Sequence, residues 1–328
     1  DIPCHAVLVR YPYPRDCGGK PTNLSNLASR IFDDSESGIM TQYCDDPVIL
    51  NQWHPLSSFD EIVVGQMHST VLLGCSISYQ LTAQGSLSVW LCSDVNFSLP
   101  LKRAYGFLWT SLGTPPDEIF AVGELDETDR QNVATGVFGV NVSFGRAIEN
   151  FLDMGHFPFV HTGILGEEPH TEVKEYDVDV SESRDEIMAT RCRFYQPQAS
   201  LASEGGADVD YVFRVPHINC ALLYKSSPGY EAEGRMDVIY MFLQPMGPEW
   251  TRAHTGMCVI DSKNSYQGIR YFQQVIFGQD KSILENQFPK RLPLDSRAET
   301  PIRADKSAIA YRRWLTKKGL TYGVIPAI

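Results

Sequence analysis

Short apolar runs separated by turn residues recur along most of this 328-residue chain, and only one stretch has the period of a long helix. A series of strands broken by Gly, Pro and Ser is typical of a mostly antiparallel sheet. The helical stretch extends from about Ser265 to Gln287, where apolar residues recur at spacings of three, four and seven. Strands first and a long helix last predict an α+β fold. A strand running into a helix is expected over 141–161, and further strands over 171–180, 186–194, 209–215, 221–224 and 236–243.

Composition divides the chain into three parts. Residues 1–39 are rich in Pro, Gly, Ser and Asp without periodicity, so we interpret them as an N-terminal extension. Residues 40–113 have the short runs of a small β-rich domain, and a Thr-Pro-Pro-Asp linker follows. Residues 114–328 then form the larger domain. In the small domain we expect strands over 48–50, 62–64, 71–73, 87–91 and 105–109.

Charge and hydropathy exclude two classes of partner. Forty acidic and 28 basic residues give a net charge of −12. A phosphate-binding surface needs a local excess of Lys and Arg, so we do not expect nucleic acid as the main partner. The longest apolar runs fall far short of the roughly 18 residues that a membrane span requires. Eight scattered cysteines without a Cys-x-x-Cys pair are typical of buried thiols in a reducing compartment, so we expect the cytoplasm.

The segment 149–161 combines several polar side chains with apolar neighbours. The polar ones of interest are Asn150, Asp153, His156 and His161. Neutral imidazole nitrogen is a ligand for Fe, Cu, Ni and Zn alike. Five residues of regular α-helix would point the two imidazoles about 140° apart, so a shared metal requires the helix to bend or end between them. Pro158 supplies that break, because it lacks an N–H and clashes with the preceding turn. Two histidines with ordinary hydrogen bonds are the alternative.

A third candidate ligand lies far along the chain. Asp280 follows Ile276 by four residues in the predicted helix, which places its carboxylate on the apolar face. Burial of an ionised carboxylate is unfavourable unless the group is paired or binds a metal. Two His and one carboxylate form the facial triad of non-heme Fe(II) oxygenases, which leaves coordination positions open for dioxygen and substrate. A salt bridge from Asp280 to Lys281 or to an Arg is the alternative.

The spacing Asn-x-x-Asp-x-x-His-x4-His over 150–161, with Asp280 about 120 residues later, resembles the iron-binding pattern of Rieske non-heme iron oxygenase α subunits. Residues 51–55 and 105–109 resemble the first and last strands of the Rieske domain of that family. Residues 305–314 resemble the C-terminal helix of its N-demethylase branch. The resemblance covers roughly residues 47 to 318.

This resemblance implies a helix-grip catalytic domain preceded by a reduced Rieske-like β domain. The implied Fe(II) ligands are His156, His161 and Asp280. Asn150 would lie beside the iron, and Asp153 would carry electrons to a ligand histidine from a neighbouring Rieske centre. Three apolar residues that flank the ligands are expected to line a substrate pocket, although such residues are more often plain core. They are Phe151, Val160 and Phe277.

One departure from the family pattern bears on electron transfer. A Rieske [2Fe–2S] centre needs Cys-x-His and a later Cys-x-x-His, and no cysteine in this chain is followed by either pattern. Only fourteen residues separate Trp90 from Tyr105, where the family places much of its cluster-binding loop. We therefore predict no [2Fe–2S] cluster in this chain. Electrons from NAD(P)H would arrive through a Rieske-bearing partner reductase, with other oxygenase subunits as further partners.

Cluster-less subunits of this kind occur among bacterial methylxanthine N-demethylases. The resemblance therefore predicts O2-dependent N-demethylation of a methylxanthine such as caffeine or 7-methylxanthine, in which an N-methyl carbon is hydroxylated and formaldehyde is released. A non-catalytic structural subunit of a hetero-oligomeric oxygenase is the alternative. A zinc hydrolase with the same ligands is less favoured, because no nearby Glu is placed as a general base.

Overall fold

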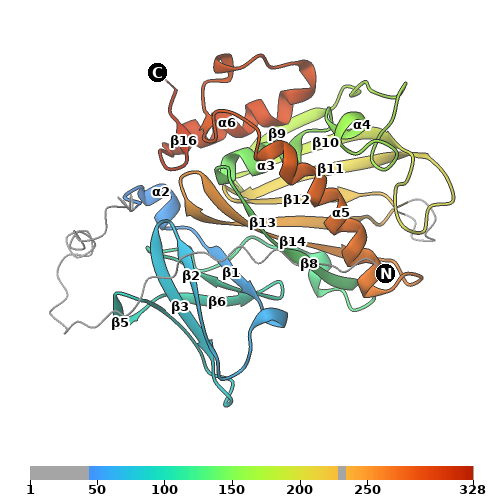
Figure 1. Ribbon diagram of the computed structural model, residues 1–328. Coiled ribbons are helices and arrows are strands. Elements are labelled where there is room, and N and C mark those ends of the chain that lie inside the picture. Colours follow the sequence, from blue (N-terminus) through green and yellow to red (C-terminus); the bar gives the residue numbers. More distant parts are fainter. Residues whose placement is uncertain (1–43, 228–233, 328) are drawn as a thin grey trace.

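The computed structural model describes residues 44–227 and 234–327 (Figure 1). The extension expected over 1–39, with Cys4 and Cys17, lies outside the described residues. Two lobes are visible, a smaller one built from the first seven strands and a larger one built around a wide sheet. We keep the predicted boundary between residues 113 and 114 as a proposal.

The smaller lobe contains two antiparallel sheets. A three-stranded sheet has the order β1 (His54–Ser58), β7 (Phe107–Thr110), β6 (Leu101–Ala104). A four-stranded sheet has the order β2 (Met67–Leu72), β3 (Cys75–Leu81), β4 (Leu87–Leu91), β5 (Asp94–Ser98). Two short helical turns complete the lobe: α2 (Pro47–Leu50) and η1 (Phe59–Glu61).

Two of the predictions of strands in this lobe are wrong. Residues 48–50 belong to helix α2, because the side chain of Asp46 accepts a hydrogen bond from Val48 N at 2.8 Å and Pro47 occupies the first turn. Residues 62–64 lie between elements, with Val63 and Val64 more than half exposed. The other three expected strands overlap β2, β4 and β7, although β7 begins only after a turn that contains Tyr105.

The larger lobe is built on a seven-stranded antiparallel sheet of order β8-β14-β13-β12-β11-β10-β9. The strands are β8 (Gln131–Val140), β9 (Asp177–Ser181), β10 (Glu186–Gln196), β11 (Ala207–His217), β12 (Cys220–Lys225), β13 (Asp237–Gly247) and β14 (Trp250–Val259). Five of them overlap the predicted strands. β8 was expected from residue 141 onward but ends at Val140, and β14 was not predicted. Its polar residues Thr251, His254 and Thr255 are buried, so the strand lacks the alternation of a half-exposed one.

Four helices pack on this sheet or along its edges: α3 (Phe144–Leu152), α4 (Phe157–Val160), α5 (Tyr266–Leu284) and α6 (Lys306–Lys318). Figure 1 shows α5 lying across one face of the sheet. It begins where the periodicity predicts, because Ser265 caps the helix by accepting from Gly268 N. The α+β prediction is confirmed. None of the described helices has both the length and the apolar character that crossing a bilayer would need.

The remaining elements of the described residues are small: the 3-10 turns η2 (Gly123–Asp126), η3 (Ser296–Ala298) and η4 (Arg303–Asp305), and the parallel pair β15 (Leu292–Pro293) and β16 (Val324–Ile325).

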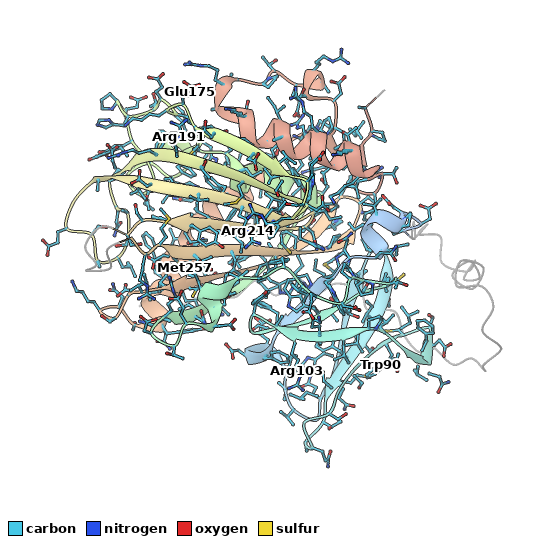
Figure 2. The ribbon with its side chains drawn as sticks, turned by 180° about the vertical axis from the view of Figure 1, so that it is seen from behind. Trp90, Arg103, Glu175, Arg191, Arg214 and Met257 are labelled. Carbon is cyan, nitrogen blue, oxygen red and sulfur yellow. The ribbon has the colours of Figure 1, made fainter. Side chains whose placement is uncertain are left out.

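The two lobes share contacts and a common apolar core. The turn after β2 reaches the end of β13, where Leu73 N donates to Pro245 O at 2.7 Å and Gly74 N to Met246 O at 2.9 Å. Buried residues of both lobes belong to one cluster, which includes Leu108 and Val140. Figure 2 shows the molecule from behind, with Arg214 on β11 facing the viewer, on the side away from α5. The sheet is therefore packed on one face by α5. On its other face, Phe107 of the smaller lobe shares a buried cluster with Phe242 of β13.

Candidate metal centre

The interruption between α3 and α4 sets the positions of the two histidines. Helix α3 ends at Leu152 with Asp153 as its C-cap. His156 lies immediately before the four-residue helix α4, and His161 lies immediately after it. Our expectation that Pro158 breaks a helix between the histidines needs correction, because the longer helix has already ended at Leu152. Pro158 instead lies in the first turn of α4, where its missing N–H is tolerated.

Helix α5 brings Asp280 to the same point. His156 Nε2 lies 3.2 Å from His161 Nε2, and the two nitrogens lie 3.3 and 3.1 Å from Asp280 Oδ1. The alternative of a salt bridge to Lys281 is not observed, because Lys281 pairs with Glu285 one turn along the helix. The fold therefore brings together three candidate ligands, two imidazoles and one carboxylate, from two segments more than a hundred residues apart.

The hydrogen-bond partners on the far side of each imidazole determine where the protons lie. His161 Nδ1 is 2.8 Å from Gln279 Oε1, and His156 Nδ1 is 3.0 Å from Asp153 Oδ2. Both partners are acceptors, so each Nδ1 can donate outward while its Nε2 is left to face the Asp280 carboxylate. The two Nε2 atoms and Asp280 Oδ1 therefore converge on one point, where a cation could replace any proton that they share.

The spacing also fits one octahedral face. Ligand atoms about 2.1 Å from a metal and at right angles to one another lie about 3 Å apart. The three observed separations are 3.1, 3.2 and 3.3 Å. This arrangement has the composition and the geometry of a 2-His-1-carboxylate facial triad.

Without a metal, the same cluster holds a proton. Burial opposes a charge on His156, but its hydrogen bonds to Asp153 and Asp280 raise its pKa to about 9. Burial also opposes the charge on Asp280, but hydrogen bonds from His156 and His161 keep the pKa of this carboxyl below its usual value. Metal binding must therefore displace a proton from the cluster.

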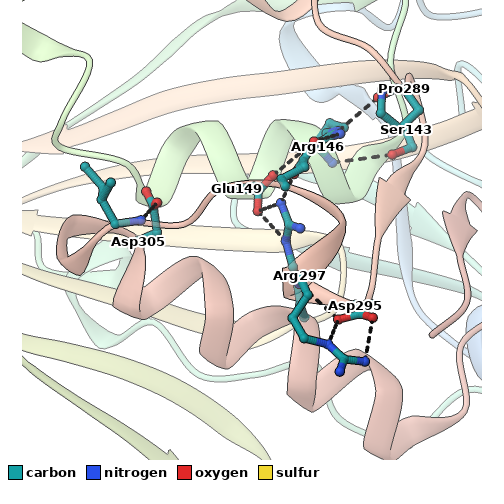
Figure 3. A network of polar contacts seen from close by, with 10 residues as sticks. Ser143, Arg146, Glu149, Pro289, Asp295, Arg297 and Asp305 are labelled. Atoms are coloured by element: carbon teal, nitrogen blue, oxygen red, sulfur yellow. Dashed lines mark hydrogen bonds and ion pairs between the residues drawn. The ribbon is translucent and has the colours of Figure 1, made fainter. Parts of the chain in front are cut away.

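A buried ionic network anchors the helix that precedes the histidines (Figure 3). Arg146 on α3 is fully buried, and its guanidinium contacts Glu149 at 2.9 Å and Glu299 at 2.6 Å. Its Nε also donates to Pro289 O at 3.1 Å. Arg312 from α6 bonds both carboxylates as well. The network ties α3 to α6 and to the segment after α5, and thereby fixes the direction in which the chain leaves α3 toward the metal centre.

A cavity between the sheet and α5 is lined at one end by the three candidate ligands. Its lining includes Phe151 and Phe277, which we expected as pocket residues. It also includes Asn150, which we expected beside the metal. Val160 is not among its lining residues, so we do not retain it as a pocket residue. Asn150 Nδ2 lies 3.4 Å from Asp280 Oδ1, at the edge of the triad.

Three residues of the site escaped the sequence analysis: Gln279, Gln196 and Tyr211. Gln279 gives no local signal, because its partner His161 lies on another segment. Gln196 follows the inward-facing Phe194 by two residues on β10, so both side chains point to the same face of the sheet. The alternation of the strand could therefore have indicated a polar residue at an inward position.

Residues 140–320 match the family model described as the Vanillate O-demethylase oxygenase C-terminal domain. Over 281 residues the chain is 45% identical to a protein of Pseudomonas sp. (strain TJI-51) named probable methylxanthine N7-demethylase NdmC, covering 86% of this chain and 98% of that relative. The chain belongs to the Rieske oxygenase family, in its N-demethylase branch. Rieske oxygenases are non-heme iron enzymes that work with electron-transfer partners on small molecules.

More distant relatives have the same fold. Methylxanthine N1-demethylase NdmA of Pseudomonas putida is 25% identical over 220 residues, which cover 65% of this chain and 58% of that protein. The solved structure of NdmA from Pseudomonas putida CBB5 with caffeine superposes with a TM-score of 0.67 at 17% identity, covering 83% of this chain and 92% of that one. The solved structure of dicamba monooxygenase bound to dicamba superposes with a TM-score of 0.65 at 15% identity, covering 82% of this chain and 97% of that one.

Proposed function

We propose that this chain is the Fe(II)-binding oxygenase component of an N-demethylase that acts on a methylxanthine such as caffeine or 7-methylxanthine. The observation that carries the proposal is the convergence of His156, His161 and Asp280 beside an apolar cavity. The similarity to the protein named methylxanthine N7-demethylase, which extends over nearly its whole length, supports the substrate class.

The reaction needs two electrons besides dioxygen. The N-methyl compound, O2, two protons and two electrons give the N–H compound, formaldehyde and water. His156, His161 and Asp280 would hold Fe(II), which would supply the chemistry of dioxygen activation. Phe151 and Phe277 present apolar surface to a flat ring and exclude water from the reacting carbon.

Asp153 is the proposed entry point for electrons. One of its oxygens accepts from His156 Nδ1, and the other accepts from Gly155 N at 2.7 Å, so the carboxylate is held in place. Its side chain is nevertheless 31% exposed, whereas that of His161 is 1% exposed. A donor at the surface can therefore approach Asp153 while the ligands stay shielded.

We propose that the cluster supplying these electrons lies on a partner. No cysteine of the sequence has the spacing of a Rieske ligand pair. A Rieske-bearing reductase that oxidises NAD(P)H would then be required, alone or with other oxygenase subunits. The described cysteines are free thiols, which supports a reducing compartment such as the cytoplasm.

Metal analysis and reconstituted turnover test the proposal. Protein purified without oxygen should contain about one iron and no acid-labile sulfide. Incubation with 7-methylxanthine, NAD(P)H and a Rieske-bearing reductase should then release one formaldehyde per demethylated product. Stoichiometric sulfide would contradict the cluster-less assignment, and iron-loaded protein that demethylates no methylxanthine with an active reductase would contradict the substrate class.

The variants His156→Ala and Asp280→Ala test whether these residues hold the iron. Each should lose iron and turnover together. A matched control is His68→Ala, which changes a histidine of the smaller lobe whose ring accepts from Val63 N and stacks on Tyr79. It should keep wild-type iron content, and wild-type iron in both ligand variants would remove the triad assignment.

A further inference from the structure

The cavity beside the metal centre has a polar row on its sheet side. One side chain comes from each of four consecutive strands: Gln196 on β10, Tyr211 on β11, Lys225 on β12 and Asp237 on β13. Tyr211 stands directly opposite Lys225 in the sheet register, and Lys225 directly opposite Asp237. Directly opposed residues of antiparallel strands point to the same face, so these side chains share the inner face that α5 covers.

Two members of this row are already engaged within the protein. Lys225 Nζ donates to Ala199 O, and burial lowers the pKa of this amine to about 8. Asp237 accepts from Ile260 N at 2.8 Å and from the Ser227 hydroxyl. Their polar atoms hold the end of the cavity together.

The other two members present unpaired atoms. The Tyr211 hydroxyl and Gln196 Oε1 are fully enclosed but have no hydrogen-bond partner among residues 44–227 and 234–327. Both side chains are 1% exposed. A buried polar atom without a partner is destabilising, and native proteins keep few of them outside functional sites. Two such atoms in one cavity point to a ligand that completes their hydrogen bonds.

The chemistry of the two atoms defines that ligand. Burial raises the pKa of Tyr211 far above its ordinary value, so its hydroxyl stays protonated and donates. Gln196 Oε1 accepts. The complementary ligand presents one carbonyl-type acceptor and one N–H donor, as an oxopurine ring does.

We infer that Tyr211 and Gln196 are the residues that select the substrate, the first by donating to a ring carbonyl and the second by accepting from a ring N–H. This inference rests on the proposed demethylase function. Phe157 helps to place Tyr211 near the centre, because its ring lies 5.0 Å from His156 and 6.3 Å from Tyr211 between centroids.

Two methylxanthines separate the two roles. Caffeine has ring carbonyls but no ring N–H, whereas 7-methylxanthine has both. Equilibrium binding is measured by calorimetry on iron-loaded protein without oxygen or reductase, so that no turnover occurs. Tyr211→Phe should weaken both ligands about tenfold. Gln196→Met should weaken 7-methylxanthine to a similar extent and leave the affinity for caffeine unchanged.

Thermal unfolding without ligand distinguishes a free hydroxyl from a structural one. Tyr211→Phe removes an unpaired hydroxyl and should leave the melting temperature unchanged or raise it. Tyr311→Phe is the matched control, since the buried Tyr311 hydroxyl donates to Ile218 O at 2.6 Å and its loss should lower the melting temperature. Tyr322→Phe removes an unpaired buried hydroxyl outside the cavity and should leave ligand affinity unchanged.

The outcomes separate the inference from the function on which it rests. If Tyr211→Phe binds each ligand with the same affinity as the wild type, the inference is overturned and the proposed demethylation stands. A fall in melting temperature for Tyr211→Phe as large as that for Tyr311→Phe also overturns it, because the hydroxyl then has a partner within the protein. Failure of the wild-type protein to bind either methylxanthine overturns the inference together with the proposed substrate class.

Discussion

Replacing Gln279 with Leu is expected to weaken metal binding without touching a ligand. Gln279 Oε1 accepts from His161 Nδ1 at 2.8 Å, and His161 is 1% exposed, so no water can replace the lost acceptor. In the metal-free variant the proton can move to Nε2 and bond Asp280 Oδ1, which lies 3.1 Å away. Metal binding must then return that proton to an Nδ1 without a partner.

The penalty is therefore about that of an unsatisfied buried donor, roughly 1 to 3 kcal/mol. Loss of a partner behind a metal-bound histidine lowers metal affinity about 10- to 100-fold in other proteins, which agrees with this range. Affinity is measured by competition with a chelator, using Co(II) as an optical probe. Gln279→Glu keeps an acceptor and should bind metal nearly as the wild type does.

Gln274→Leu is the control on the same helix. Gln274 Nε2 donates to Thr135 O at 2.7 Å, so its replacement disturbs the packing of α5 on β8 but not the imidazole. It should lower stability and leave metal affinity unchanged. Wild-type metal affinity in Gln279→Leu would refute the reasoning that the outer hydrogen bond fixes the proton on Nδ1.

Two further predictions concern stability. Arg146→Met leaves Glu149 and Glu299 with Arg312 alone in a buried setting and should lower the free energy of unfolding by about 3 to 5 kcal/mol in urea titrations. Arg297→Met, which removes an 85% exposed partner of Asp295 in the same region (Figure 3), should change it by less than about 1 kcal/mol, and equal losses would contradict the importance of burial. Acid should destabilise the fold as well: burial lowers the pKa of His54 to about 4 and those of His217 and His254 to about 3. As the pH falls below about 6.5, these histidines take up protons in the unfolded chain before they do so in the folded protein. Each histidine should therefore lower the free energy of unfolding by about 2 kcal/mol at pH 5. His254→Phe should reduce the loss between pH 7 and 5 relative to the wild type, and an unchanged loss would show that this histidine is not buried in its neutral form.

The sequence by itself determined those features that depend on local spacing. The apolar period of α5 and the N-cap at Ser265 follow from neighbouring residues, and so does the placement of Asp280 on the buried face of that helix. The Asn-x-x-Asp-x-x-His-x4-His pattern likewise identified the candidate ligands, because each ligand type is chemically distinctive.

Only the tertiary structure decided how these parts meet. The two Nε2 atoms face each other because α3 ends at Leu152, which depends on packing and was not visible in the helical pattern around Pro158. The partner of His161 and the unpaired atoms of Gln196 and Tyr211 depend on contacts between elements far apart in the chain. Hydrogen bonds of this kind have no sequence period, since a residue's partner is set by the fold that brings the two segments together.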